Sequence, residues 1–192
     1  MKKEKTSHLL LIRLSALGDV VMLLPVVRSM REQHPEVQLS VLSQPFTRPL
    51  FEAIEGVNFI AADIRKRHKG IRGLWLLARE LEKGNSFTAI ADVHSVLRTW
   101  ILTFFLRLQH LPRKYRIASI DKGRKEKEHL TRAKAKQLVP LEHSVKRYAD
   151  VLQRLTFKLQ VPYELGGLEP VDLPPAVALF FTLTRPRVGI AP

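Results

Sequence analysis

The sequence predicts an α/β protein built on a parallel sheet flanked by helices. Strand-like and helix-like segments alternate along the chain, which is typical of parallel sheets with right-handed crossovers. The first strand-like segment is a continuous apolar run from Leu9 to Ile12, as expected for a strand covered on both faces. With 192 residues, 45% of them hydrophobic, the chain can form one domain with a substantial core.

Each expected element has a local signal. Apolar residues run or alternate in the five predicted strands, 8–13, 37–43, 57–61, 87–93 and 115–119. They recur every three or four positions in the five predicted helices, 19–33, 46–54, 71–83, 94–109 and 143–159. Pro25 falls inside the first helix and is expected to bend its axis. The charged stretch 121–137 has little to bury and is predicted to be a mobile loop.

The turn between the first strand and the first helix is the candidate site. Small residues, Ser15, Ala16 and Gly18, keep this turn thin, and Asp19 stands in the first turn of the helix. Ligand crevices of open α/β sheets lie at this end of the strands. An Asp at a helix start is more often only a cap, so the residues alone leave Asp19 as a cap or a ligand-facing group. Ser15 is expected to cap the turn, with a hydrogen bond to substrate as the alternative.

Positive charge dominates the composition. The chain has 32 Lys and Arg against 18 Asp and Glu, a formal net charge of +14. Two segments concentrate it, 65–72 and 113–136. This excess favours an anionic partner, either nucleic acid, acidic lipid, or a phosphorylated or carboxylated substrate; the alternative is a merely solvated surface. Zero cysteines exclude disulfides, thiolate zinc sites and thiol catalysis, and no metal-ligand spacing is present.

Composition also suggests where the domain ends. Residues 1–160 form the predicted domain, and 161–186, rich in proline, read as a linker. Residues 187–192 are predicted to be the first strand of a second domain, truncated in this chain. Trp75 and Trp100 fall on predicted helices and are expected in the core or at an interface. The helix over 94–109 is expected to be buried against the sheet, with a contact to acidic lipid headgroups as the alternative.

Four segments together resemble the N-terminal half of the bacterial lipopolysaccharide heptosyltransferases, glycosyltransferases of family 9 with a GT-B fold. They are IRLSALGDVVMLLPVVRSMREQHP, AIADVHSVLRTW, LEHSVKRYADVL and VGIAP. The resemblance implies a Rossmann-like acceptor-binding domain, an inverting transfer of heptose from ADP-heptose to the lipopolysaccharide inner core, and no cofactor. The donor would be bound mainly by the second domain, so the chain alone would be inactive.

The resemblance also implies roles for single residues. Asp19 matches the proposed catalytic base of the family. Expected acceptor-binding residues are Ser15, Gly18, Arg65, Lys66, Lys69, Arg124, His143 and Arg147. Arg67 stands where the family has an aromatic residue. Arginine binds carboxylates and phosphates in a bidentate manner, and lysine acts as a point charge, which suits an anionic acceptor.

The implied location is the cytoplasmic side of the inner membrane, with the cationic surface near acidic headgroups. Two alternative functions remain open from the sequence. A nucleic-acid-binding module would use the same basic segments, but the chain lacks an aromatic stacking platform and a helix-turn-helix pattern. A non-catalytic remnant would bind the acceptor or another anionic partner without transferring sugar.

Overall fold

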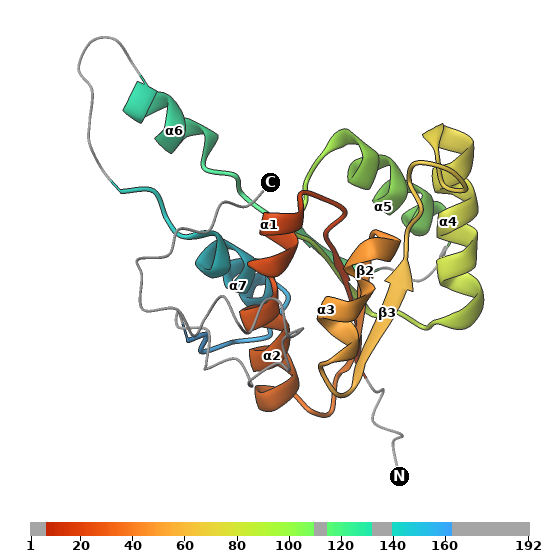
Figure 1. Ribbon diagram of the computed structural model, residues 1–192, viewed down its shortest axis with the longest axis horizontal. Helices are drawn as coiled ribbons and strands as arrows, with labels where there is room; N and C mark the ends of the chain where they lie inside the picture. The colour runs from red at the N-terminus through yellow and green to blue at the C-terminus, as the bar shows by residue number, and fades with distance from the viewer. Residues whose placement is uncertain (1–6, 110–114, 132–139, 163–192) are drawn as a thin grey trace, which may run out of the picture.

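A five-stranded parallel sheet forms the centre of the molecule in the computed structural model, which describes residues 7–109, 115–131 and 140–162 (Figure 1). The strands are β1 His8–Ile12, β2 Gln38–Ser43, β3 Val57–Ala61, β4 Ala89–Asp92 and β5 Arg116–Ser119. Their order across the sheet is β3-β2-β1-β4-β5, and every neighbouring pair is parallel. All strands therefore end at the same edge, and β1 lies at the centre.

Helices cover both faces of this sheet. The helices are α1 Leu17–Val21, α2 Leu24–Gln33, α3 Arg48–Glu52, α4 Gly70–Gly84, α5 Leu97–Gln109, α6 Arg124–Thr131 and α7 Ser144–Arg154, with a short 3₁₀ turn η1 over Pro45–Thr47. Helix α6 does not cover the sheet but extends away from it (Figure 1). One core joins α1, α2, α3 and α7 to the sheet, and a second joins α4 and α5 to the opposite face. Alternate residues of β1 supply each core: Leu9 and Leu11 the first, Leu10 and Ile12 the second.

The strand order places a topological switch point between β1 and β4. The chain proceeds from β1 outward through β2 to β3, then returns to the other side of β1 to form β4 and β5. The connections after β1 and β4 therefore leave the sheet in opposite directions and open a crevice between them. Asp19 follows β1, and His94 follows β4, so both stand at this crevice.

The predicted continuous helix over 19–33 is wrong, because two helices occupy this segment. The first ends at Val21, and the second begins at Leu24. Pro25 lies in the first turn of α2, where a missing N–H removes no intrahelical hydrogen bond. It starts a helix here and does not bend one.

The predicted mobile loop over 121–137 is also wrong in part, because residues Arg124–Thr131 form α6. The Asp121 side chain accepts a 2.9 Å hydrogen bond from the Gly123 amide, and Gly123 takes a positive φ of 59° just before the helix starts. Charged residues such as Lys and Glu have good helix propensity, so lack of apolar side chains does not forbid a helix. Residues 132–139 lie outside the described part of the chain, as do 163–192, which hold nearly all of the predicted linker and the predicted strand 187–192.

Candidate active site at the switch point

Asp19 is the third residue of α1, and its side chain is 45% exposed. Its Oδ2 atom forms an ion pair with Nη2 of Arg13 and accepts a 3.4 Å hydrogen bond from the Ala16 amide. Within the described residues, Oδ1 has no partner. The carboxylate thus closes the first turn with one oxygen and keeps the other available, so the cap and the ligand-facing interpretations are compatible.

Arg13 fixes this carboxylate from beneath. Its side chain is only 8% exposed, and Nη1 donates a 2.5 Å hydrogen bond to the Val93 carbonyl after β4. The guanidinium also lies over the Tyr148 ring, 5.7 Å from its centroid. The Tyr148 hydroxyl donates to the Asp19 carbonyl over 3.3 Å. Sequence reasoning missed Arg13; the available signal was a cation directly after a buried apolar strand.

Ser15 and His94 join the two sides of the crevice. Ser15 Oγ lies 3.2 Å from His94 Nε2, and α1 has no side-chain cap, so the expected capping role of Ser15 is wrong. Burial, followed by the nearby Arg13 charge, lowers the pKa of His94 to about 4. His94 is therefore neutral at pH 7. Its Nδ1 atom is buried and has no hydrogen-bond partner among the described residues.

Asp92 is a second carboxylate at the switch point, and it is fully buried at the end of β4. Its Oδ1 accepts from the amides of His94 and Ser95, at 3.0 and 2.8 Å. Its Oδ2 accepts a 2.8 Å hydrogen bond from the Thr99 hydroxyl. These bonds occupy both oxygens and fix the start of α5, so Asp92 positions the connection and is closed to a ligand. The sequence analysis did not single it out.

An open pocket of about 500 Å³ lies beside Asp19. Residues that follow β1 and β5, residues of α1 and α6, and residues of α7 and of the segment before it line the pocket: Arg13, Asp19, Ile120, Lys122, Lys127, Leu141, Glu142, His143, Ser144, Arg147 and Tyr148. Two residues predicted from the sequence, His143 and Arg147, thus lie together with Asp19. Lys122 joins them without having been predicted, and burial together with the Arg13 and Arg124 charges lowers its pKa.

Arg147 is bound to protein groups at every guanidinium nitrogen. Nε donates to the Glu142 carbonyl and Nη1 to the Asp121 carbonyl, both at 3.2 Å, and Nη2 pairs with Glu126 at 2.5 Å. This side chain holds the segment before α6 against α7 and forms a wall of the pocket. His143 is the N-cap of α7, where its Nδ1 accepts from the Val145 amide at 3.4 Å.

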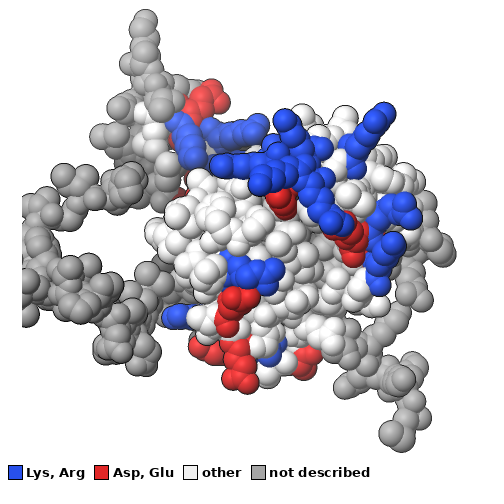
Figure 2. Space-filling view, turned by 45° about the vertical axis from the view of Figure 1, so that its right-hand side comes forward, with Lys and Arg blue, Asp and Glu red and all other residues white. Residues whose placement is uncertain are grey.

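The predicted cations Arg65, Lys66 and Lys69 follow β3, two strands away from β1. All three are exposed, and none lines the pocket beside Asp19. Their loop is anchored by buried His68, whose Nε2 lies 3.1 Å from Glu80 of α4. Arg67 pairs with the same Glu80. Figure 2 shows Lys and Arg side chains gathered along the upper edge of the molecule, which is the edge where the strands end in Figure 1.

Two further predicted residues, Arg124 and Gly18, lie next to the pocket beside Asp19 and do not line it. Arg124 lines an adjoining pocket of about 430 Å³ that shares Ile120 and Lys122 with the one beside Asp19. Gly18 is exposed on α1, and a Cβ atom added to it would meet nothing within 4 Å. The backbone at Gly18 is therefore accessible, as the thin turn predicts.

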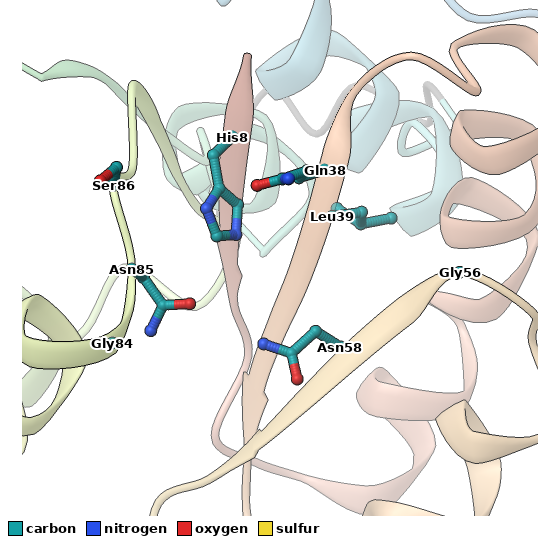
Figure 3. A pocket seen from close by; sticks show the side chains of 8 residues that line it. All are labelled: His8, Gln38, Leu39, Gly56, Asn58, Gly84, Asn85 and Ser86. Carbon is teal, nitrogen blue, oxygen red and sulfur yellow. The ribbon is translucent and has the colours of Figure 1, made fainter. Parts of the chain in front are cut away.

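A further pocket, of about 440 Å³, lies at the opposite edge of the sheet (Figure 3). His8 of β1, Asn58 of β3 and Asn85 after α4 surround it. Ser40 joins two of them, with its Oγ 2.9 Å from His8 Nε2 and 3.1 Å from Asn58 Nδ2. Burial lowers the pKa of His8, and the residues that line this pocket include no lysine or arginine.

Within the described ranges, no group of three or more histidine or acidic side chains could hold a metal ion. No helix in that part of the chain is both long and apolar enough to cross a bilayer.

The chain is similar to known glycosyltransferases both in sequence and in structure. No family model matches the chain. It is 28% identical to the lipopolysaccharide core heptosyltransferase OpsX of Haemophilus influenzae over 104 residues, which cover 54% of this chain and 29% of OpsX. A glycosyltransferase family 9 protein of Veillonella parvula has a TM-score of 0.58 at 20% identity, over 82% of this chain and 45% of that one. Escherichia coli heptosyltransferase WaaC with ADP has a TM-score of 0.55 at 15% identity, over 83% of this chain and 50% of WaaC.

These similarities confirm the predicted fold class, a Rossmann-like parallel sheet of the kind that GT-B glycosyltransferases contain. The predicted resemblance to the heptosyltransferases of family 9 is confirmed for part of the chain. The chain spans about half the length of the solved relatives that it matches.

Proposed function

Because the chain is related to lipopolysaccharide heptosyltransferases in sequence and in fold, we propose that it is the acceptor-binding part of an inverting glycosyltransferase. The donor would be ADP-heptose, and the acceptor a sugar of the lipopolysaccharide inner core. A second domain would bind most of the donor, so we expect little or no transferase activity from these 192 residues alone.

The observation that carries this proposal is the half-exposed Asp19 carboxylate at the switch point. Its Oδ2 is held by Arg13 and the Ala16 amide, while Oδ1 is available beside a pocket with several cations. A general base must reach the proton that it removes, and a fixed carboxylate with one accessible oxygen meets that requirement. The geometry of His94 suits a base less well, because its Nε2 is hydrogen-bonded to Ser15 and its Nδ1 is buried.

The proposed reaction has one displacement step. The acceptor hydroxyl oxygen bonds to the anomeric carbon of heptose from the face opposite the diphosphate. The bond from that carbon to the diphosphate oxygen breaks, and ADP leaves with the electron pair. Asp19 takes the hydroxyl proton through Oδ1. The configuration at the anomeric carbon is inverted, and no covalent enzyme intermediate forms.

The cations at the same edge suit the acceptor. Lys122 and Lys127 line the pocket beside Asp19, Arg124 lines the adjoining one, and Arg65, Lys66 and Lys69 lie exposed farther along the edge. Carboxylates and phosphates of an inner-core acceptor would bind such groups. We further propose that the protein works at the cytoplasmic face of the inner membrane, where its acceptor is embedded.

The test is heptose transfer by the protein that carries both domains. We expect Asp19→Asn to lower kcat by a factor of about 10² to 10⁴, the usual contribution of a general base, with little change in acceptor affinity. Glu55→Gln, which changes an exposed carboxylate before β3, is the matched control and should retain activity. Unchanged kcat in Asp19→Asn would remove the base assignment. Acceptor binding with no transfer by the unaltered two-domain protein would instead favour the non-catalytic alternative.

A further inference from the structure

The outer face of α4 and α5 exposes large apolar side chains at helical spacing. On α5, Leu97, Trp100, Phe104 and Leu108 are 70%, 52%, 60% and 49% exposed. On the adjacent α4, Ile71, Trp75 and Leu76 are exposed as well. The two helices pack together, with the Trp75 ring edge-on to Phe105 at 5.2 Å. The outward side of the helix predicted to be buried therefore forms an apolar surface, which we call the α4–α5 face.

The charges on the α4–α5 face all have one sign. Its exposed charged residues are Arg72, Arg79, Lys83, Arg98 and Arg107. The two acids of these helices are partly buried and paired: Glu80 with Arg67 and His68, and Glu82 with the Tyr115 hydroxyl. An apolar surface with tryptophans, whose exposed charged residues on α4 and α5 are all cationic, matches the boundary between acyl chains and anionic headgroups.

The α4–α5 face continues into the candidate site. Trp100 belongs to the exposed stripe, and it also lines the pocket that contains Lys122 and Arg124. Its Nε1 donates a 3.3 Å hydrogen bond to Ser95 Oγ, in the connection fixed by Asp92. A surface-bound ligand with a lipid part and a sugar part could therefore leave its lipid at this face while its sugar reaches the pockets.

We propose that the α4–α5 face docks on an anionic lipid bilayer. This inference rests on the proposed function, which requires an acceptor embedded in a membrane, and it names the surface that meets the membrane. A symmetric dimer through the same face would bring each copy's cations against those of the other, which is unfavourable without counter-charges. An anionic bilayer supplies both the apolar phase and those counter-charges.

The two tryptophans of the chain make a direct test possible, because both lie on this face. The protein is mixed with vesicles of phosphatidylglycerol and phosphatidylethanolamine, with and without acyl chains brominated near the headgroup. We expect the vesicles to bind the protein, to shift its tryptophan emission to shorter wavelength, and to quench that emission when brominated. Phosphatidylcholine vesicles should bind at least about tenfold more weakly, since the cations lose their partners.

Two double variants separate the apolar and the charged contributions. Phe104→Ser with Leu108→Ser, and Arg98→Gln with Arg107→Gln, should each weaken binding to anionic vesicles by about tenfold or more. The matched controls lie outside this face: Phe46→Ser, which changes an exposed apolar residue on η1, and Arg28→Gln on α2. Thermal unfolding checks that each variant is folded.

Several outcomes would overturn the proposal. Binding to anionic vesicles without quenching by brominated chains would place the membrane contact elsewhere. Tryptophans already shielded from acrylamide without lipid, or a dimer that the Phe104 and Leu108 changes dissociate, would assign the face to a protein contact. The assay contains neither donor nor acceptor, so its failure leaves the transferase proposal standing. Membrane binding by a protein that transfers no heptose would conversely support the docking face alone.

Discussion

Arg13 and Asp19 form an ion pair across the turn that leaves β1, and the pair divides the carboxylate into a held oxygen and an available one. Oδ2 faces the guanidinium, and Oδ1 has no partner among the described residues. The same guanidinium donates to the Val93 carbonyl after β4. One buried side chain thus ties the carboxylate to both strands of the switch point.

Arg13→Lys should impair catalysis more than it impairs binding of the acceptor. A lysine ammonium is a compact charge that cannot present the same planar fork to Val93 and Asp19, so the carboxylate loses its fixed orientation. In the two-domain protein we expect kcat to fall by about tenfold to a hundredfold. We expect the free energy of unfolding to fall by about 1–3 kcal/mol, because the buried Val93 carbonyl loses its charged donor. Steady-state kinetics and denaturant unfolding measure the two effects. Arg28→Lys, at an exposed position of α2, is the control. Equal losses of kcat and stability in both variants would contradict the role of Arg13 in orienting Asp19.

His94 should make the protein less stable in acid. Its pKa is lowered to about 4 by burial, whereas an unfolded histidine titrates near its ordinary value of 6.5. Between these values the unfolded chain binds more protons, so the free energy of unfolding falls as pH decreases through this range. The expected loss between pH 7 and pH 5 is about 1–2 kcal/mol. Denaturant unfolding at both values measures it.

His94→Asn supplies the comparison for this pH dependence. Asparagine has no titration in this range, so the loss between pH 7 and pH 5 should shrink. A remainder is expected from His8, since burial lowers its pKa as well. An unchanged slope in His94→Asn would show that the protonation of His94 is not coupled to folding.

Gly123→Ala should disturb the wall of the pocket beside Asp19. Gly123 has φ near 59°, and an added Cβ would lie 2.6 Å from Nη2 of Arg147. The clash displaces the side chain that holds the start of α6, and the strained backbone adds a cost, together about 1–3 kcal/mol. Thermal unfolding and acceptor titration test this. Gly84→Ala at the end of α4 meets no atom within 4 Å and should be close to neutral; similar losses in both would refute the Arg147 clash as the cause.

Arg65→Gln with Lys69→Gln tests whether the exposed cations after β3 reach the acceptor. Within the described residues neither side chain has an ion pair, so the free energy of unfolding should change by less than about 0.5 kcal/mol. If both contact acceptor anions, its affinity should fall by about tenfold, and the dependence of binding on salt should weaken. Isothermal titration at two salt concentrations measures this, with Arg28→Gln as control. Unchanged affinity would confine acceptor binding to the pockets near Asp19.

Local sequence patterns predicted most of the elements but not their interruptions. The strand β3 matches its predicted bounds, and α4 differs by one residue at each end, because apolar periodicity and the glycine at its end are local signals. The break before Pro25 was missed, since the apolar stripe continues across it. Helix α6 was missed because its few apolar residues gave no periodicity, while Asp121, Gly123 and Arg147 fix its start through contacts that the pattern does not contain.

The sequence by itself determined the α/β class, the thin turn after β1 and the placement of Asp19 at a strand end. These features follow from backbone preferences and hydrophobic spacing within about 20 residues. Only the tertiary structure decided which groups meet at that turn. Arg13 reaches Val93, and Tyr148 reaches Asp19, across 80 and 129 residues of chain. Such contacts depend on the strand order β3-β2-β1-β4-β5, and so does the exposure of the α4–α5 face. Packing between segments that are distant in the sequence determines both these contacts and this exposure, and a local sequence pattern does not contain that information.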